Sequence, residues 1–123
     1  MDRLRMTASW TPTRQENDSL RRHQHVLELQ RVDAIWPWLA DHHGTLTALD
    51  APHAAHPERL SFAELAQCIA TAAASFRMHG LEAGEVVALF AENSPRWLVA
   101  DQGLMRAGAA DAVRGASAPV EEL

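Results

Sequence analysis

From Ser61 to Gly108 the chain reads SFAELAQCIATAAASFRMHGLEAGEVVALFAENSPRWLVADQGLMRAG. Its first residues form a capping box, Ser61 followed by Glu64, which marks the start of a helix. Apolar side chains recur at helical spacing and predict one buried face, made by Phe62, Leu65, Ile69, Ala72 and Phe76. Gly80 stands where a helix end favours a left-handed residue. This half of the segment therefore predicts one long helix.

The second half of the segment predicts a strand and another helix. The run Val86–Ala91 is apolar throughout, as in a parallel strand covered on both faces. Asn93-Ser94-Pro95 then starts a helix, because serine is a good N-cap and proline is tolerated in the first turn. Gly108 ends that helix, and the alanine-rich run Ala109–Arg114 is a weaker strand candidate. Strand, helix and strand joined by short loops predict a right-handed βαβ unit.

A small hairpin is predicted upstream of the capping box. Thr45–Asp50 and Arg59–Phe62 can pair across Ala51–Glu58, a proline-containing connection that is long for a hairpin. Before it, a helix is predicted over Ser19–Trp36. Pro37 is expected to interrupt or restart this helix, and Gly44 to end it. Residues 1–17 are polar and are expected to be disordered or loosely attached, so the folded domain is expected to span residues 18–123.

Composition narrows the class of protein. The 123 residues are 47% hydrophobic and 22% charged, which is ordinary for a globular domain. A net charge of −5 disfavours nucleic acid as a partner. The single cysteine, Cys68, cannot form an internal disulfide and is expected to be a half-buried apolar residue. Neither a secretory leader nor an 18-residue apolar run occurs, so a cytoplasmic location is expected, with peripheral attachment to a membrane as the alternative.

Seven histidines raise the question of a metal site. His23-x-His25 and Asp41-His42-His43 could in principle bind zinc or nickel. However, His23 and His25 fall on different faces of a helix, adjacent histidines diverge, and no second pair completes a tetrahedral set. Solvated or capping histidines are therefore favoured, and His79 suits a helix C-terminus. No metal ligand is predicted.

Two further features could bind a ligand or merely support the fold. Asn93-Ser94-Pro95 lies where a parallel strand ends and a helix begins, the edge at which ligands of open α/β sheets gather. A cap alone is favoured over proximity to a ligand. The tryptophans Trp36, Trp38 and Trp97 are expected to pack between elements and not to stack on bases.

Several segments together resemble the N-terminal part of AMP-forming acyl ligases: Leu60–Leu65, Gly80–Leu89 and Asn93–Trp97. Others resemble the long-chain branch, nearest to bacterial acyl–acyl carrier protein synthetases: Trp36–Leu39, Thr47–Asp50, Ala51–His53, Ala100–Gly103, Ala107–Ala109 and Val113–Gly115. Glu85 stands where the family more usually has aspartate, and Arg96 stands where it more usually has an acidic residue. The resemblance covers about residues 33–123. It implies an α/β fold, namely an incomplete N-terminal AMP-binding-type subdomain with a hairpin, helices and one βαβ unit.

The resemblance also implies a reaction. The complete enzymes use ATP and Mg²⁺ to convert a fatty acid to an acyl-adenylate, and then form a thioester with coenzyme A or acyl carrier protein. Their phosphate loop is rich in serine, threonine and glycine and ends in Pro-Lys-Gly. Here the six glycines are scattered and all eleven basic residues are arginine. The sequence therefore predicts no catalytic, cofactor-binding or metal-binding residue, no bound cofactor, and no ligase activity for these 123 residues alone.

Alternatives to the ligase portion stay open. The chain could be a non-catalytic remnant that binds a partner or a lipid, the partner of a separate remainder of a split ligase, or, less favoured, a histidine-rich metal-binding module. Val86–Ala91 would keep uncovered apolar surface if it had few neighbours. Marginal stability or self-association is therefore expected.

Overall fold

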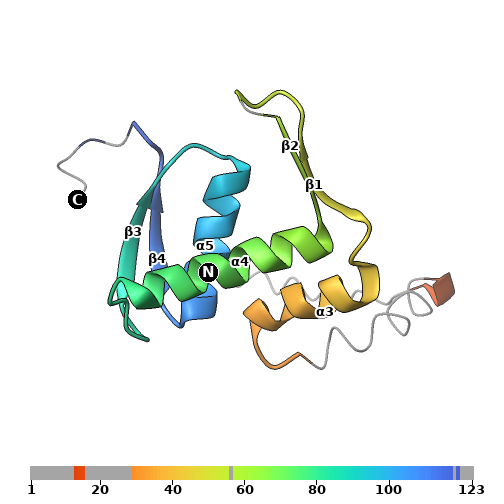
Figure 1. Cartoon of the computed structure of the whole chain (residues 1–123), viewed down its shortest axis with the longest axis horizontal. Helices are drawn as coiled ribbons and strands as arrows, with labels where there is room; N and C mark the ends of the chain where they lie inside the picture. Colours follow the sequence, from red (N-terminus) through yellow and green to blue (C-terminus); the bar gives the residue numbers. More distant parts are fainter. Residues whose placement is uncertain (1–12, 16–28, 56, 118, 120–123) are drawn as a thin grey trace, which may run out of the picture. The chain divides into compact units, whose positions relative to one another are not determined.

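The computed structural model describes residues 13–15, 29–55, 57–117 and 119 (Figure 1). The chain divides into two units, Met1–Gln30 and Arg31–Leu123, and all elements below belong to the second. The histidines His23 and His25, and most of residues 1–17, lie outside the described residues.

The predicted helix Ser19–Trp36 can be compared with the structure only at its end, where the prediction is wrong. Arg31 is extended, Val32–Ala34 form a short 3-10 helix (η1), and helix α3 begins afresh at Ile35 and spans Ile35–His43. This break places Pro37 in the first turn of α3, where its missing N–H removes no helical hydrogen bond. Proline therefore restarts the helix, one of the two predicted outcomes. Gly44 follows as its C-cap, as predicted.

The predicted hairpin is confirmed, with slightly different bounds. Strand β1 (Thr47–Ala51) pairs antiparallel with β2 (Glu58–Ser61), with an irregular register between Thr47 and Leu49. Asp50 and Arg59 face each other across the strands and form an ion pair of 2.7 Å. The hairpin projects away from the helices in Figure 1.

Helix α4 (Phe62–Met78) begins and ends as its sequence predicts. The Glu64 N–H donates to Ser61 Oγ at 3.2 Å, and the Ser61 N–H donates to Glu64 Oε2 at 2.8 Å. Hydrogen bonding of the Glu64 carboxylate with the backbone and then the side chain of Ser61 lowers the pKa of that carboxyl. At the other end Gly80 has φ +95°, and the Leu81 N–H donates to the Phe76 carbonyl at 3.1 Å, which closes the last turn.

The βαβ unit is confirmed. Strands β3 (Val86–Phe90) and β4 (Ala110–Arg114) are parallel, in register from Val86↔Ala110 to Phe90↔Arg114, and helix α5 (Pro95–Ala107) connects them. The Trp97 N–H donates to Ser94 Oγ at 3.1 Å, which caps α5 as predicted. Gly108 ends the helix with φ +91°.

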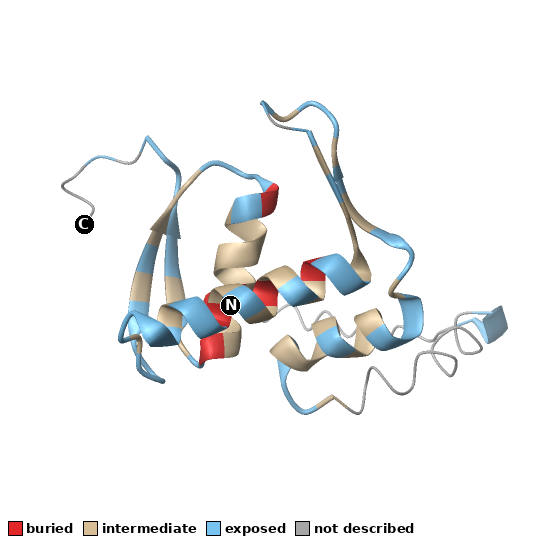
Figure 2. Cartoon of the chain, in the orientation of Figure 1, coloured by how far each residue is buried: buried red, intermediate tan, exposed pale blue. Residues whose placement is uncertain are grey.

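The core lies between α4 and α5 and not on the sheet (Figure 2). The buried apolar residues are Leu65, Ile69 and Ala73 of α4 with Leu104 and Ala107 of α5. Gly103 makes the close approach possible, since a Cβ there would come within 2.8 Å of the Ala72 Cβ. Strand β3 departs from its prediction, because Val86 is 68% exposed and Ala88 is also exposed. Among the described residues β3 pairs with β4 alone, so its apolar faces are only partly covered.

Candidate functional site

A hollow of about 290 Å³ lies between strand β2, helix α4 and the first half of α5. We call it the α5 groove. Its lining is mostly apolar and consists of Glu58, Leu60, Cys68, Ala72, Phe76, Pro95, Arg96, Val99 and Ala100. A smaller hollow of about 180 Å³ shares Glu58, Pro95 and Arg96 with it and extends to Ser94. The groove therefore reaches the start of α5, where proximity to a ligand was the less favoured of the two interpretations of the sequence.

Local structure explains why these side chains meet. Glu58 and Leu60 alternate along β2 and so lie on the same face of the strand. Cys68, Ala72 and Phe76 are spaced by four residues and form one stripe along α4. The small alanine in the middle of that stripe leaves room that a larger side chain would fill. The groove thus follows directly from the two periodicities in the sequence.

Ser94 contributes a cap to this region. Its hydroxyl oxygen accepts the Trp97 N–H, and Pro95 behind it is buried at the first position of α5. The favoured interpretation, that Asn93-Ser94-Pro95 makes the turn and caps the helix, agrees with this geometry. Asn93 is exposed.

The described lining of the α5 groove is mostly apolar and is suited to hold an apolar group. Cys68 is half-buried in the lining, as predicted, and the described lining residues include no histidine. The charged residues of the lining are Glu58 and Arg96, one of each sign.

A polar chain that the sequence did not predict connects three elements. The Trp36 Nε1–H donates to Gln102 Oε1 at 2.7 Å, and Gln102 Nε2 donates to Asp101 Oδ2 at 2.6 Å. Asp111 of β4 continues it: hydrogen bonding with Asp101, burial and the negative charge of Asp101 all raise the pKa of the Asp111 carboxyl. Its Oδ2 atom is buried and has no hydrogen-bond partner among the described residues. The one sequence signal was an aspartate between two alanines of the strand, Ala110 and Ala112.

The remaining candidate residues have structural surroundings. His42 and His43 are exposed, and the His42 ring stacks on Trp38 with centroids 4.2 Å apart. His79 Nδ1 lies 2.8 Å from the Ser75 carbonyl at the end of α4. Trp36, Trp38 and Trp97 are half-buried. Within the described part of the chain, no three histidine, cysteine or acidic side chains gather where they could hold a metal ion.

Comparison with known proteins identifies what the chain is similar to. The family of AMP-binding enzymes matches residues 37–123. A chloroplastic long-chain-fatty-acid–[acyl-carrier-protein] ligase of Arabidopsis thaliana, AEE15, is 44% identical over 96 residues, which are 78% of this chain and 13% of that protein. The chain thus spans about an eighth of the length of the curated relatives it matches.

Solved structures share the fold. The fatty acid AMP ligase of Legionella pneumophila matches with a TM-score of 0.71 at 19% identity, over 78% of this chain and 17% of that one. The N-terminal subdomain of Klebsiella oxytoca NpsA matches with a TM-score of 0.68 at 24% identity, over 76% of this chain and 23% of that one. The predicted α/β fold, an N-terminal subdomain of an acyl-adenylating ligase, is therefore confirmed. None of the helices in the described residues is long and apolar enough to cross a bilayer.

Proposed function

Because the chain belongs to the family of AMP-binding enzymes, we propose that it forms the N-terminal portion of an ATP-dependent long-chain fatty-acyl ligase. The proposed enzyme joins a fatty-acid carboxylate to the α-phosphate of ATP and releases pyrophosphate. The resulting acyl-adenylate then passes its acyl group to a thiol and releases AMP. The single observation that supports the substrate class is the 44% identity to a ligase whose name states that it joins long-chain fatty acids to acyl carrier protein.

The residues of this chain do not fit an ATP or magnesium site. The sequence has no lysine and no glycine-rich loop that could cradle a triphosphate with successive N–H groups. The described residues also hold no cluster of metal-ligating side chains. In the proposed enzyme these groups belong to the part of the relatives' length that this chain does not match. The role proposed for residues 31–123 is structural support, through the α4–α5 core and the surfaces beside it.

A chimera tests the proposal. The matching 96-residue segment of the Arabidopsis ligase is replaced by the corresponding residues of this chain, and fatty-acid-dependent ATP–pyrophosphate exchange is measured. We expect activity in the chimera and none in the 123-residue chain alone. A second chimera carrying Gly103→Val should lose activity, because the valine prevents α4 and α5 from packing. A folded but inactive first chimera, or exchange catalysed by the purified 123-residue chain, would contradict the proposal.

The same chimera also tests which thiol accepts the acyl group, that of acyl carrier protein or that of coenzyme A. We propose acyl carrier protein over coenzyme A, because the matched relative is named for that acceptor. The active chimera is offered each acceptor in turn, and the thioester product is quantified. Faster transfer to coenzyme A would reverse this assignment.

A second candidate function is that of a non-catalytic module that binds an apolar chain. The α5 groove favours it, because seven of its nine lining residues are apolar or small. If it binds a fatty acid, Cys68→Trp should fill the groove and abolish binding, measured by backbone NMR shifts during titration with palmitate. Ala74→Trp, at an exposed position of the same helix, should not. Equal binding by both variants excludes the groove.

A further inference from the structure

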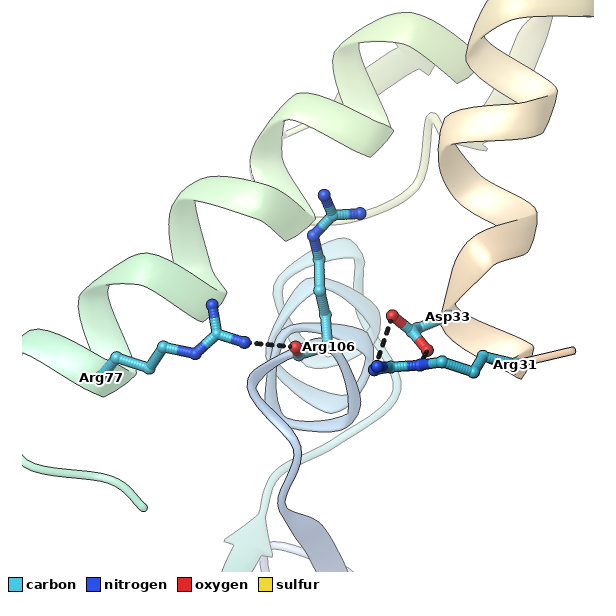
Figure 3. Close-up of polar contacts among 4 residues, drawn as sticks. All are labelled: Arg31, Asp33, Arg77 and Arg106. Atoms are coloured by element: carbon cyan, nitrogen blue, oxygen red, sulfur yellow. Dashed lines mark hydrogen bonds and ion pairs between the residues drawn. The ribbon is translucent and has the colours of Figure 1, made fainter. Parts of the chain in front are cut away.

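Three arginines surround a second hollow, which shares no residue with the α5 groove (Figure 3). Its volume is about 400 Å³, and its lining is Arg31, Asp33, Ala34, Pro37, Arg77 and Arg106. Arg77 lies in the last turn of α4, Arg106 in the last turn of α5, and Arg31 directly before η1. We call the four charged residues, the three arginines and Asp33, the arginine cluster.

Among the residues that the structure describes, Arg31 is the one arginine of this cluster that pairs with a carboxylate. Arg31 forms a two-pronged pair with Asp33, with Nε–Oδ1 at 2.9 Å and Nη2–Oδ2 at 3.2 Å. Arg77 donates one hydrogen bond, of 2.8 Å, to the Arg106 carbonyl, which carries no formal charge. Within the described ranges, neither Arg77 nor Arg106 is in an ion pair. The cluster therefore carries a net charge of about +2 in a chain whose total is −5.

A purely structural role accounts for only part of this arrangement. Basic side chains in the last turn of a helix interact favourably with its free carbonyl groups, and the bond from Arg77 to Arg106 is of that kind. Arg106 behaves differently. In Figure 3 its side chain extends away from its own carbonyl oxygen and lies between the ribbons of α4 and α3. A guanidinium group has five N–H donors, and none of those of Arg106 donates a hydrogen bond to another described residue.

We propose that Arg77 and Arg106, beside the Arg31–Asp33 pair, bind a phosphate dianion. A guanidinium group donates two parallel hydrogen bonds to an oxyanion, and two unpaired guanidiniums match the charge of a phosphate monoester better than that of one carboxylate. The phosphate can be free in solution or the headgroup of a lipid. This site is independent of the ATP site of the proposed ligase, since the chain contains no triphosphate cradle.

The direct test is an NMR titration of the 123-residue chain with inorganic phosphate at low ionic strength, observing the arginine Nε–H signals. We expect the Arg77 and Arg106 signals to move and the Arg59 signal to stay. Arg106→Gln should weaken binding at least about tenfold, because it removes charge-assisted hydrogen bonds. Arg59→Gln is the matched control: it changes the net charge equally, but Arg59 is an exposed hairpin residue paired with Asp50. It should leave the affinity within about twofold.

Asp33→Asn separates a binding effect from a folding defect. This variant removes the negative charge that Arg31 now faces at 2.9 Å, so phosphate affinity should rise. Damage to the fold can only lower affinity, and an increase therefore supports the site.

The source of the phosphate is tested with two kinds of vesicle, one of phosphatidylcholine alone and one of phosphatidylcholine with phosphatidic acid. Binding only to the second, and lost in Arg106→Gln, assigns a headgroup, whereas binding to inorganic phosphate alone assigns the free ion.

The proposal is overturned by either of two results. One is the absence of any shift of the Arg77 and Arg106 signals with phosphate, together with no binding to phosphatidic acid. The other is an equal loss of affinity in Arg106→Gln and Arg59→Gln, which would mean that phosphate responds to overall charge and not to the arginine cluster.

Discussion

Asp111 is the residue whose surroundings conflict most with its chemistry. Its carboxyl is half-buried next to Asp101, and its Oδ2 has no hydrogen-bond partner among the described residues. Hydrogen bonding with Asp101, burial and the negative charge of Asp101 raise the pKa of Asp111, so the folded state binds this proton more tightly than the unfolded chain does. Because the folded pKa is raised, the favourable contribution of protonated Asp111 is present at acidic pH and is lost as pH rises through that value.

Asp111→Asn is therefore expected to stabilise the fold at neutral pH. Asparagine is neutral, and its amide can donate to Asp101, a gain on the order of 1 kcal/mol, typical of one hydrogen bond. The measurement is the free energy of unfolding by urea as a function of pH. The advantage over the natural chain should shrink as pH falls below the folded pKa of Asp111. Asp50→Asn serves as the control, since it removes only an exposed ion pair. A destabilised Asp111→Asn protein at neutral pH would contradict this account.

Residues that act locally could be predicted from the sequence, and residues that act across the fold could not. Ser61, Ser94, Gly80 and Gly108 all cap helices as expected, because a cap depends only on the few residues next to it. The hydrogen bond from Trp36 to Gln102 joins residues 66 positions apart. No local pattern specifies such a contact, and the same holds for the pairing of Asp101 with Asp111.

At the scale of elements, the contact between α4 and α5 organises the folded unit. Gly103 removes the side chain at the point of closest approach, where an added Cβ would lie 2.8 Å from the Ala72 Cβ and 3.3 Å from Phe76 Cε2. The buried residues of both helices are neighbours of this point, including Ala73 and Leu104. The helix pair therefore depends on a small residue that the apolar stripes alone did not single out.

Gly103→Val is expected to separate the two helices. The valine side chain must displace Ala72 and Phe76, and overpacking of this kind costs about 1–3 kcal/mol. Urea unfolding followed by circular dichroism measures the loss. Gly115→Ala is the control, because nothing lies within 4 Å of its added Cβ and its φ is not positive. If both variants unfold at the same urea concentration, the helices do not make the close contact described.

The sequence predicted where the strands lie but not how far they are buried. The positions of β3 and β4 followed from their apolar and alanine-rich runs, and the hairpin was located to within two residues at each strand end. What the run Val86–Ala91 could not indicate was how much of it is covered. That depends on which other segments lie beside the sheet, which is not a property of the strand's own sequence.

At the scale of the whole molecule, the distribution of apolar surface affects solution behaviour. Val86 is 68% exposed and Val113 is 39% exposed, and both belong to the two-stranded parallel sheet. Parallel sheets normally have both faces buried, and unpaired strand edges promote pairing with another chain. If the chain is marginally stable or self-associates, we expect this exposed sheet surface to be the cause.

Val86→Lys is expected to reduce self-association of the 123-residue chain. A lysine on an exposed strand opposes edge-to-edge pairing and adds a charge to an apolar face. Sedimentation velocity over a range of concentrations gives the oligomer distribution. Val32→Lys is matched in residue type and exposure, at 72%, but lies in η1 away from the sheet, and should change little. A monodisperse monomer in the unchanged chain, with a sharp two-state melt, would refute the expectation.

Ser61 has one further consequence, because it is both the last residue of β2 and the N-cap of α4. No linker separates the hairpin from the helix, and the N–H groups of Phe62 and Ala63 are held by the Leu46 and Gly44 carbonyls. Strand β2 of the hairpin is therefore joined directly to α4 by a hydrogen-bonded junction. Helix α4 has 17 residues and is about 25 Å long. We therefore expect a displacement of the hairpin to move α4 with it, as far as the turn at Gly80.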